Sequence, residues 1–216
     1  MVYLFITIIL LLLPFSRVIF LLYKVRFHKT SIPSRLKPVK TTIIMGSGGH
    51  TAEMLRLVKN INLLNYNPRL YVIASTDKGS EAKVMSLESE TGRSKESGSY
   101  DIIKIPRSRH VSQSYLSSVF STLYSVLHCI PLVYREKPEL ILCNGPGTCV
   151  PICAIAFCMK AFWVCDTKIV FIESICRVRT LSLTGKLLLH FADEFIVQWK
   201  DLHDLYQNTK YMGCLV

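Results

Sequence analysis

From Thr41 onward the chain alternates short β-branched or apolar runs with segments whose apolar residues recur at helical spacing. We expect strands over 41–45, 69–75, 100–106, 139–143, 168–174 and 194–199. Between them we expect helices over 51–64, 112–134, 150–165 and 181–192, with a weak helix and a mobile loop in 77–99. Strands joined by crossover helices form parallel sheets. This alternation predicts an α/β fold with a doubly wound parallel sheet.

An apolar segment, Val2 to Tyr23, precedes this region and is followed by basic residues. At about 1.5 Å per residue it spans about 33 Å, enough to cross a bilayer core. Arg17 costs about 3 kcal/mol near a helix centre, less than the surrounding apolar residues contribute in favour of insertion. A cleaved signal peptide or a buried core helix are the alternatives, but the positive charges follow the span rather than precede it. We expect 1–23 to be a single transmembrane anchor and 24–40 a basic cytosolic linker.

Charge and cysteine content narrow the function classes. The 216-residue chain carries a net charge of +11, and seven of its Lys and Arg residues lie in the first 52 residues, which contain no acid. No nucleic-acid recognition motif accompanies this basic arm, so we expect no nucleic-acid partner. The eight cysteines form neither a C-x-x-C pair nor a zinc spacing. We expect a reduced, cytosolic domain that holds no metal and no cofactor.

Two glycine-rich turns each join a predicted strand to a predicted helix. GSGGH follows the first strand and NGPGT the fourth. Glycine lets the backbone approach a ligand, and the free N–H groups of a helix start favour an anion. Open α/β sheets bind ligands at the carboxyl ends of their strands. We therefore expect a phosphate-bearing ligand beside Ser47, Gly48, Gly49, Asn144, Gly145, Gly147 and Thr148.

Four side chains with acid–base or charged groups are predicted at the same edge. His50 ends the first turn and Glu173 the fifth strand, and either is suited to remove a proton from a sugar hydroxyl. The alternatives are a capping role for His50 and a helix N-cap formed by Glu173 and the serine after it. Arg107 and Arg109 follow the third strand, where arginine suits phosphate, although an exposed loop is equally ordinary.

A dinucleotide-dependent enzyme is a weak alternative. The fingerprint G-x-G-x-x-G begins at Gly46 and Gly48 but is broken by Thr51. Asp77, after the second strand, lies where such enzymes place a ribose-binding acid.

The motifs GSGGHT with Glu53, IPRSR, LCNGPGTCVP and IESICRVRTLSLTGKLLLHFADEFIVQW together resemble one family. It comprises the membrane-anchored subunits of the UDP-N-acetylglucosamine (UDP-GlcNAc) transferase that adds the second GlcNAc to dolichol-pyrophosphate-GlcNAc. More distantly, the chain resembles the acceptor half of the bacterial transferase that glycosylates undecaprenyl-linked murein precursors. The resemblance implies a GT-B fold, in which two Rossmann-like domains face each other, and identifies residues 41–216 as the acceptor-side domain.

The resemblance also implies partners and roles. A separate soluble subunit would bind most of the donor UDP-GlcNAc, and the acceptor would be dolichol-linked GlcNAc at the endoplasmic reticulum membrane, with the domain facing the cytosol. His50 or Glu173 would serve an inverting transfer. We expect the apolar tail to dock on the partner through Tyr211, Met212, Leu215 and Val216, with a frayed terminus as the alternative.

Two further alternatives concern the membrane. A non-catalytic scaffold with structural glycine turns is the rival of a transferase subunit. The segments 112–134 and 150–165 are both apolar enough to rest on a bilayer. For the second we expect ordinary core packing, and for the first the sequence favours neither.

Overall fold

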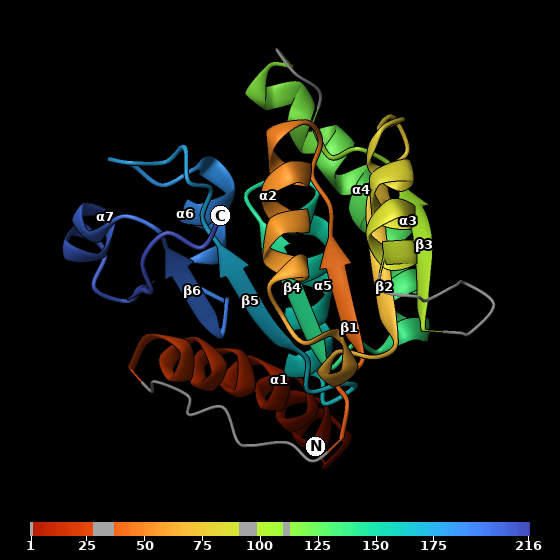
Figure 1. The fold of residues 1–216 in the computed structure, drawn as a ribbon. Coiled ribbons are helices and arrows are strands. Elements are labelled where there is room, and N and C mark those ends of the chain that lie inside the picture. The colour runs from red at the N-terminus through yellow and green to blue at the C-terminus, as the bar shows by residue number, and fades with distance from the viewer. Residues whose placement is uncertain (1, 28–36, 91–98, 110–112) are drawn as a thin grey trace.

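The fold is taken from a computed structural model that describes residues 2–27, 37–90, 99–109 and 113–216. Its centre is a seven-stranded sheet in the order β3-β2-β1-β4-β5-β6-β7, with every neighbouring pair parallel (Figure 1). The predicted doubly wound parallel sheet is confirmed. The strands are β1 (Thr41–Ile44), β2 (Arg69–Ala74), β3 (Tyr100–Ile105), β4 (Leu140–Asn144), β5 (Lys168–Ile172), β6 (Glu194–Val197) and β7 (Lys210–Tyr211).

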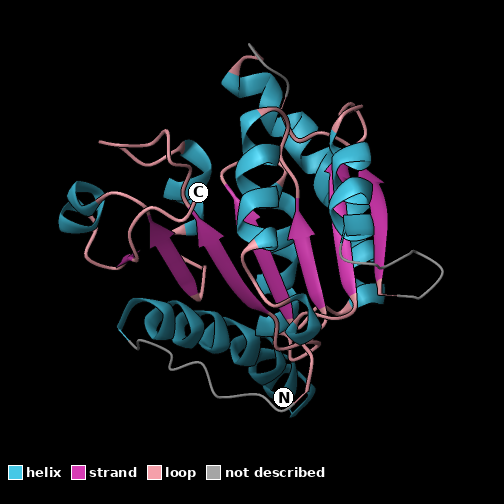
Figure 2. Cartoon of the chain, in the orientation of Figure 1, coloured by secondary structure: helices cyan, strands magenta, loops and turns pink. Residues whose placement is uncertain are grey.

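Helices cover both faces of this sheet (Figure 2). On one face lie α2 (Gly49–Lys59) and α3 (Ser80–Glu90), and on the other α4 (Tyr115–Glu136) and α5 (Cys149–Ala161). Alternate strand residues point to opposite faces, so Ile43 packs in a cluster with Met54 of α2, whereas Ile44 packs with Ile152 of α5. A 3₁₀ turn, η1 (Leu63–Asn65), and the short helices α6 (Leu183–Leu188) and α7 (Lys200–Leu205) complete the chain.

The strand order creates a switch point between β1 and β4. The chain moves outward from β1 through β2 to β3, then returns to place β4 on the other side of β1. Ile44 pairs with Cys143, so the turns after these two strands emerge side by side at the carboxyl edge of the sheet. This is the place where open α/β sheets bind ligands.

The N-terminal helix α1 (Val2–Phe27) lies across the opposite, amino edge of the sheet and contacts α5 (Figure 1). It continues past the predicted end at Tyr23, and residues 28–36 of the predicted linker lie outside the described residues. The Arg17 guanidinium lies 5.4 Å from the ring centroid of Trp163. Such a cation–π contact stabilises the positive charge of the Arg17 guanidinium.

Helix α4 presents its apolar stripe to the outside. Its polar face instead binds the loop after β3, because Ser121 and Thr122 donate to the carbonyl of Ser108 and Ser125 donates to that of Pro106. Among the residues whose side chains are described, Leu116–Glu136 is the one segment long and apolar enough to cross a membrane. Of the two alternatives that the sequence left open for this stripe, core packing is therefore excluded, whereas the core packing expected for α5 is confirmed. The exposed stripe comprises Leu116, Val119, Phe120, Leu123, Leu127 and Ile130.

Candidate functional site

The two glycine turns meet around the side chain of His50. A Cβ atom on Gly145 would lie 2.6 Å from Cε1 of the imidazole, and one on Gly46 would collide with His50 Cβ. Gly145 also adopts a φ of +65°, which side chains with a Cβ rarely tolerate. Both glycines are therefore required where they stand, because no other residue leaves room for this ring.

A chain of hydrogen bonds connects His50 to buried polar side chains. Its Nδ1 lies 3.1 Å from Asn144 Oδ1, and Asn144 Nδ2 donates to Glu53 Oε2 at 2.9 Å. The other oxygen of Glu53 accepts from Ser174 Oγ at 2.7 Å. The sequence motifs suggested no hydrogen-bonding role for Glu53, and for Ser174 they suggested a share in a helix N-cap. A signal for Glu53 was present, since it follows His50 by three positions on α2 and so shares its helix face.

The first turn is open to solvent and has a cation beside it. Gly48 and Gly49 are exposed, and Gly48 has a φ of +61° with no side chain to cap α2. Arg107 donates from Nη2 to Ser47 Oγ at 2.9 Å. Helix-start N–H groups, a hydroxyl and a guanidinium together suit an anionic oxygen.

The second turn supplies the neighbouring start of α5. Gly147 is partly exposed, and the buried Thr148 makes no side-chain capping hydrogen bond to the helix. Arg109 is turned another way, donating to the carbonyl of Gln113, which precedes α4. The structure thus brings Arg107, rather than Arg109, to the Ser47 side chain.

Glu173 lies under the same edge but does not reach solvent. Its side chain is 0 % exposed, and its carboxylate accepts from the backbone N–H and Oγ of Ser182 and from the N–H of Ser174. Burial raises the pKa of the Glu173 carboxyl above its usual range, although hydrogen bonds from Ser182 and Ser174 offset part of the effect. Ser182 in turn caps α6. This carboxylate organises the 174–182 loop.

The residues that suggested a dinucleotide-dependent enzyme instead stabilise local turns. Asp77 accepts from the N–H groups of Gly79 and Ser80 and so caps the turn into α3. Burial alone would raise the pKa of Asp77, but hydrogen bonds from Ser80 and Gly79 outweigh it and hold the pKa below its usual range. Thr51 donates to the carbonyl of Gly46 and locks the first turn. Within the described part of the chain, no group of three His, Cys, Asp or Glu side chains suits a metal ion.

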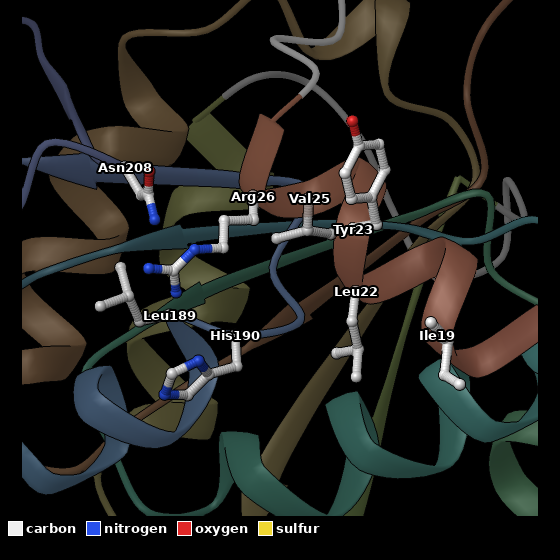
Figure 3. Close-up of a pocket in the computed structure, with 8 residues that line it drawn as sticks. All are labelled: Ile19, Leu22, Tyr23, Val25, Arg26, Leu189, His190 and Asn208. Atoms are coloured by element: carbon white, nitrogen blue, oxygen red, sulfur yellow. The ribbon is translucent and has the colours of Figure 1, made fainter.

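A cavity of about 400 Å³ lies away from this site, between α1 and the segments that follow α6 and α7 (Figure 3). Leu22 and Arg26 of α1 form one wall, and Leu189, His190 and Asn208 form the other. The segments before β6 and β7 belong to the amino edge of the sheet, opposite His50. This cavity brings together none of the residues predicted for the site.

The C-terminal tail folds back over the α2 side of the sheet. Leu215 donates from its N–H to Gln198 Oε1, and Leu215 and Val216 pack against the cluster that contains Met54. Tyr211 and Met212 remain 46 % and 61 % exposed. Of the four predicted docking residues, these two offer apolar surface to another molecule.

Comparison with known proteins agrees with this architecture. The family model described as "Oligosaccharide biosynthesis protein Alg14 like" matches residues 41–215. The proteins named UDP-N-acetylglucosamine transferase subunit ALG14 from Rattus norvegicus and Homo sapiens are 52 % and 48 % identical to this chain. Each match covers 81 % of this chain and 82 % of the relative. The protein of that name from Yarrowia lipolytica is 44 % identical over 88 % of this chain and 87 % of its own.

Among solved structures, Acinetobacter baumannii MurG shares the fold, with a TM-score of 0.51 and 13 % identity. The similarity covers 75 % of this chain but 42 % of the MurG chain. The shared fold thus accounts for less than half of the MurG chain. On the family match and the identities together, the chain belongs to the Alg14 family.

Proposed function

We propose that this chain is the membrane-anchored, acceptor-side subunit of a two-chain UDP-GlcNAc transferase. It helps transfer GlcNAc to GlcNAc-pyrophosphoryl-dolichol on the cytosolic face of the endoplasmic reticulum, the second step in building the lipid-linked N-glycan precursor. The observation that carries this proposal is His50, held by Asn144 between two glycine turns at the switch point of the sheet. The names of its relatives supply the donor sugar.

In this proposal His50 is the general base. The 4-hydroxyl of the acceptor sugar attacks the anomeric carbon of UDP-GlcNAc, and its proton passes to Nε2 of a neutral His50. The new C1–O4 bond forms as the bond from C1 to the diphosphate breaks, and UDP leaves with the electron pair. The anomeric centre is inverted, which gives a β-1,4 linkage.

The acceptor pyrophosphate binds at the first turn. Exposed Gly48 and Gly49 at the start of α2, with Ser47 and its partner Arg107, form its cradle. From the second turn, the partly exposed Gly147 borders the same place, and the buried Asn144, Gly145 and Thr148 lie beneath it. Glu173, the other candidate base, instead stabilises the 174–182 loop, because its carboxylate is buried and already accepts three hydrogen bonds.

The opposite wall of the cleft comes from a soluble donor-binding subunit that carries most of the UDP-GlcNAc contacts. The part of this chain that matches MurG, 75 % of its length, covers 42 % of the MurG chain, which supports a second domain supplied by another polypeptide. Exposed Tyr211 and Met212 give the tail a docking surface beside Leu215 and Val216.

Two apolar elements hold the domain at the bilayer. Helix α1 is the single-pass anchor, and the basic residues after it favour the cytosol for the domain. The exposed stripe of α4 begins near the Arg109 loop and rests on the membrane surface, where a polyprenyl acceptor lies.

Replacing Leu116, Phe120 and Leu127 with Gln should raise KM for a dolichol-length acceptor about tenfold and leave KM for a short water-soluble acceptor unchanged. If the variant and the wild-type protein had equal KM values for the dolichol-length acceptor, this role of α4 would be contradicted.

His50→Ala tests the catalytic assignment. The co-purified complex should lose on the order of 10²-fold or more in kcat, the usual contribution of a general base, while still binding its partner. His190→Ala is the matched control, because His190 lines the cavity at the opposite edge. Unchanged turnover in His50→Ala would favour the alternative, a membrane scaffold with structural glycine turns.

A further inference from the structure

We propose that Glu53 is a positioning residue: acting through Asn144, it holds His50 in the Nδ1–H tautomer and leaves the lone pair of Nε2 available to a substrate. The inference rests on the proposed function for its purpose, since it explains how His50 is prepared as a base. Its central statement concerns the position of one proton, which can be measured without any turnover.

The directions of the hydrogen bonds determine which ring nitrogen of His50 carries the hydrogen. An ionised carboxylate only accepts, so the 2.9 Å contact with Glu53 Oε2 requires Asn144 to present its NH₂ group there. The amide oxygen of Asn144 therefore faces His50 Nδ1 at 3.1 Å. Because that oxygen also only accepts, Nδ1 must carry the hydrogen, and the neutral ring has its lone pair on Nε2.

Burial makes this arrangement hard to reverse. Asn144 is 1 % exposed and Glu53 is 8 % exposed, so water does not compensate for a flipped amide. The second oxygen of Glu53 is already held by Ser174 Oγ, which fixes the carboxylate from the β5 side. A flipped Asn144 would place its carbonyl oxygen against a carboxylate and its NH₂ group against His50 Nδ1–H.

The surrounding backbone fixes the ring in the matching orientation. An ideal Cβ on Gly145 would lie 2.6 Å from Cε1 and 3.0 Å from Nδ1 of His50, but 3.5 Å from Nε2. The Nδ1–Cε1 edge is thus packed against the second glycine turn, and Nε2 lies farther from it. His50 itself is partly exposed.

The direct test is nitrogen-15 NMR of histidine in the full chain, co-purified with its donor-binding partner in lipid nanodiscs. Two-bond proton–nitrogen correlations at pH 8 report which ring nitrogen is protonated, and His50→Gln assigns the signal. We expect His50 to be mainly Nδ1–H, although imidazole side chains in water favour Nε2–H. A mainly Nε2–H ring in the wild-type protein would overturn the proposal.

Glu53→Gln tests the relay itself. A glutamine amide can present either its oxygen or its NH₂ group to Asn144, so the constraint on the amide is lost. We expect the tautomer to move toward Nε2–H and kcat to fall by about tenfold or more, with KM for both substrates nearly unchanged. Glu194→Gln is the matched control, because Glu194 is also 8 % exposed but begins β6 at the other end of the sheet.

The outcomes separate the two proposals. A folded Glu53→Gln protein with an unchanged tautomer contradicts the relay, whatever its activity. If Glu53→Gln does not fold, the wild-type tautomer still decides. An Nδ1–H ring combined with full activity of His50→Ala would leave the relay standing and remove the catalytic role of His50.

Discussion

At the scale of single residues, the candidate site is built on positions that lack a side chain. Gly145 combines a φ of +65° with contact against the His50 ring. The absence of a Cβ there therefore both permits the backbone conformation and leaves room for the ring. Gly48 has a similar φ of +61°, but a Cβ there would meet nothing within 4 Å. Substituting these two glycines in turn therefore separates the free-energy cost of backbone strain from the cost of displacing His50.

Gly48→Ala should lose about 1 kcal/mol of unfolding free energy, the usual cost of a Cβ at positive φ, and Gly145→Ala should lose more, because its Cβ would also collide with the His50 ring. Only Gly145→Ala should also change the His50 nitrogen-15 shifts and reduce transfer by more than tenfold, because the ring must move. Urea unfolding and the transfer assay give the two quantities. A Gly145→Ala protein with wild-type turnover would show that the ring position does not matter.

The turn residues and His50 were predictable because each signal is local: glycines and a histidine within a few positions of a strand end. The relay was not. Glu53 bonds Asn144 across 91 positions and Ser174 across 121, and such pairs depend on side-chain rotamers that composition and spacing leave open. The burial of Glu173 was missed for the same reason, since its partner Ser182 lies across a loop.

At the scale of elements, a buried ion pair joins β2 to α3. Arg69 donates from Nε and Nη2 to the carboxylate of Glu88 at 2.7 Å, and the Tyr71 hydroxyl donates to the same group. Both charged side chains are 0 % exposed. Burial, followed by the Glu88 contact, raises the pKa of Tyr71 well above its usual range.

Glu88→Gln should cost about 3–5 kcal/mol of unfolding free energy, because it leaves a buried guanidinium without its counter-charge. Glu90→Gln on the same helix is the control: its pair with Lys59 is exposed, so we expect a loss of less than about 1 kcal/mol. Equal losses in the two variants, measured by urea unfolding, would contradict a buried pair.

The sequence predicted the strands and the main helices, because period and glycine punctuation are properties of short segments. It did not predict β7 or α7, which are too short to show a period. For α4 the period marked the apolar stripe but not its direction. The direction follows from hydroxyl groups on the other face that bind the loop after β3, a tertiary contact.

At the scale of the whole molecule, the two edges of the sheet carry different elements. Helix α1 crosses the amino edge, and His50 and both glycine turns occupy the carboxyl edge. The His50 edge belongs to a single lobe, whereas the GT-B-type neighbour is more than twice as long as the part matched here. The proposed transfer therefore requires a second polypeptide to complete the cleft.

The most direct measurement is GlcNAc transfer by the full-length chain in liposomes, with and without the soluble donor-binding subunit. Radiolabelled UDP-GlcNAc and a prenyl-pyrophosphoryl-GlcNAc acceptor serve as substrates. We predict transfer by the complex and none by either chain separately. Elongation of the acceptor by this chain alone would contradict the account.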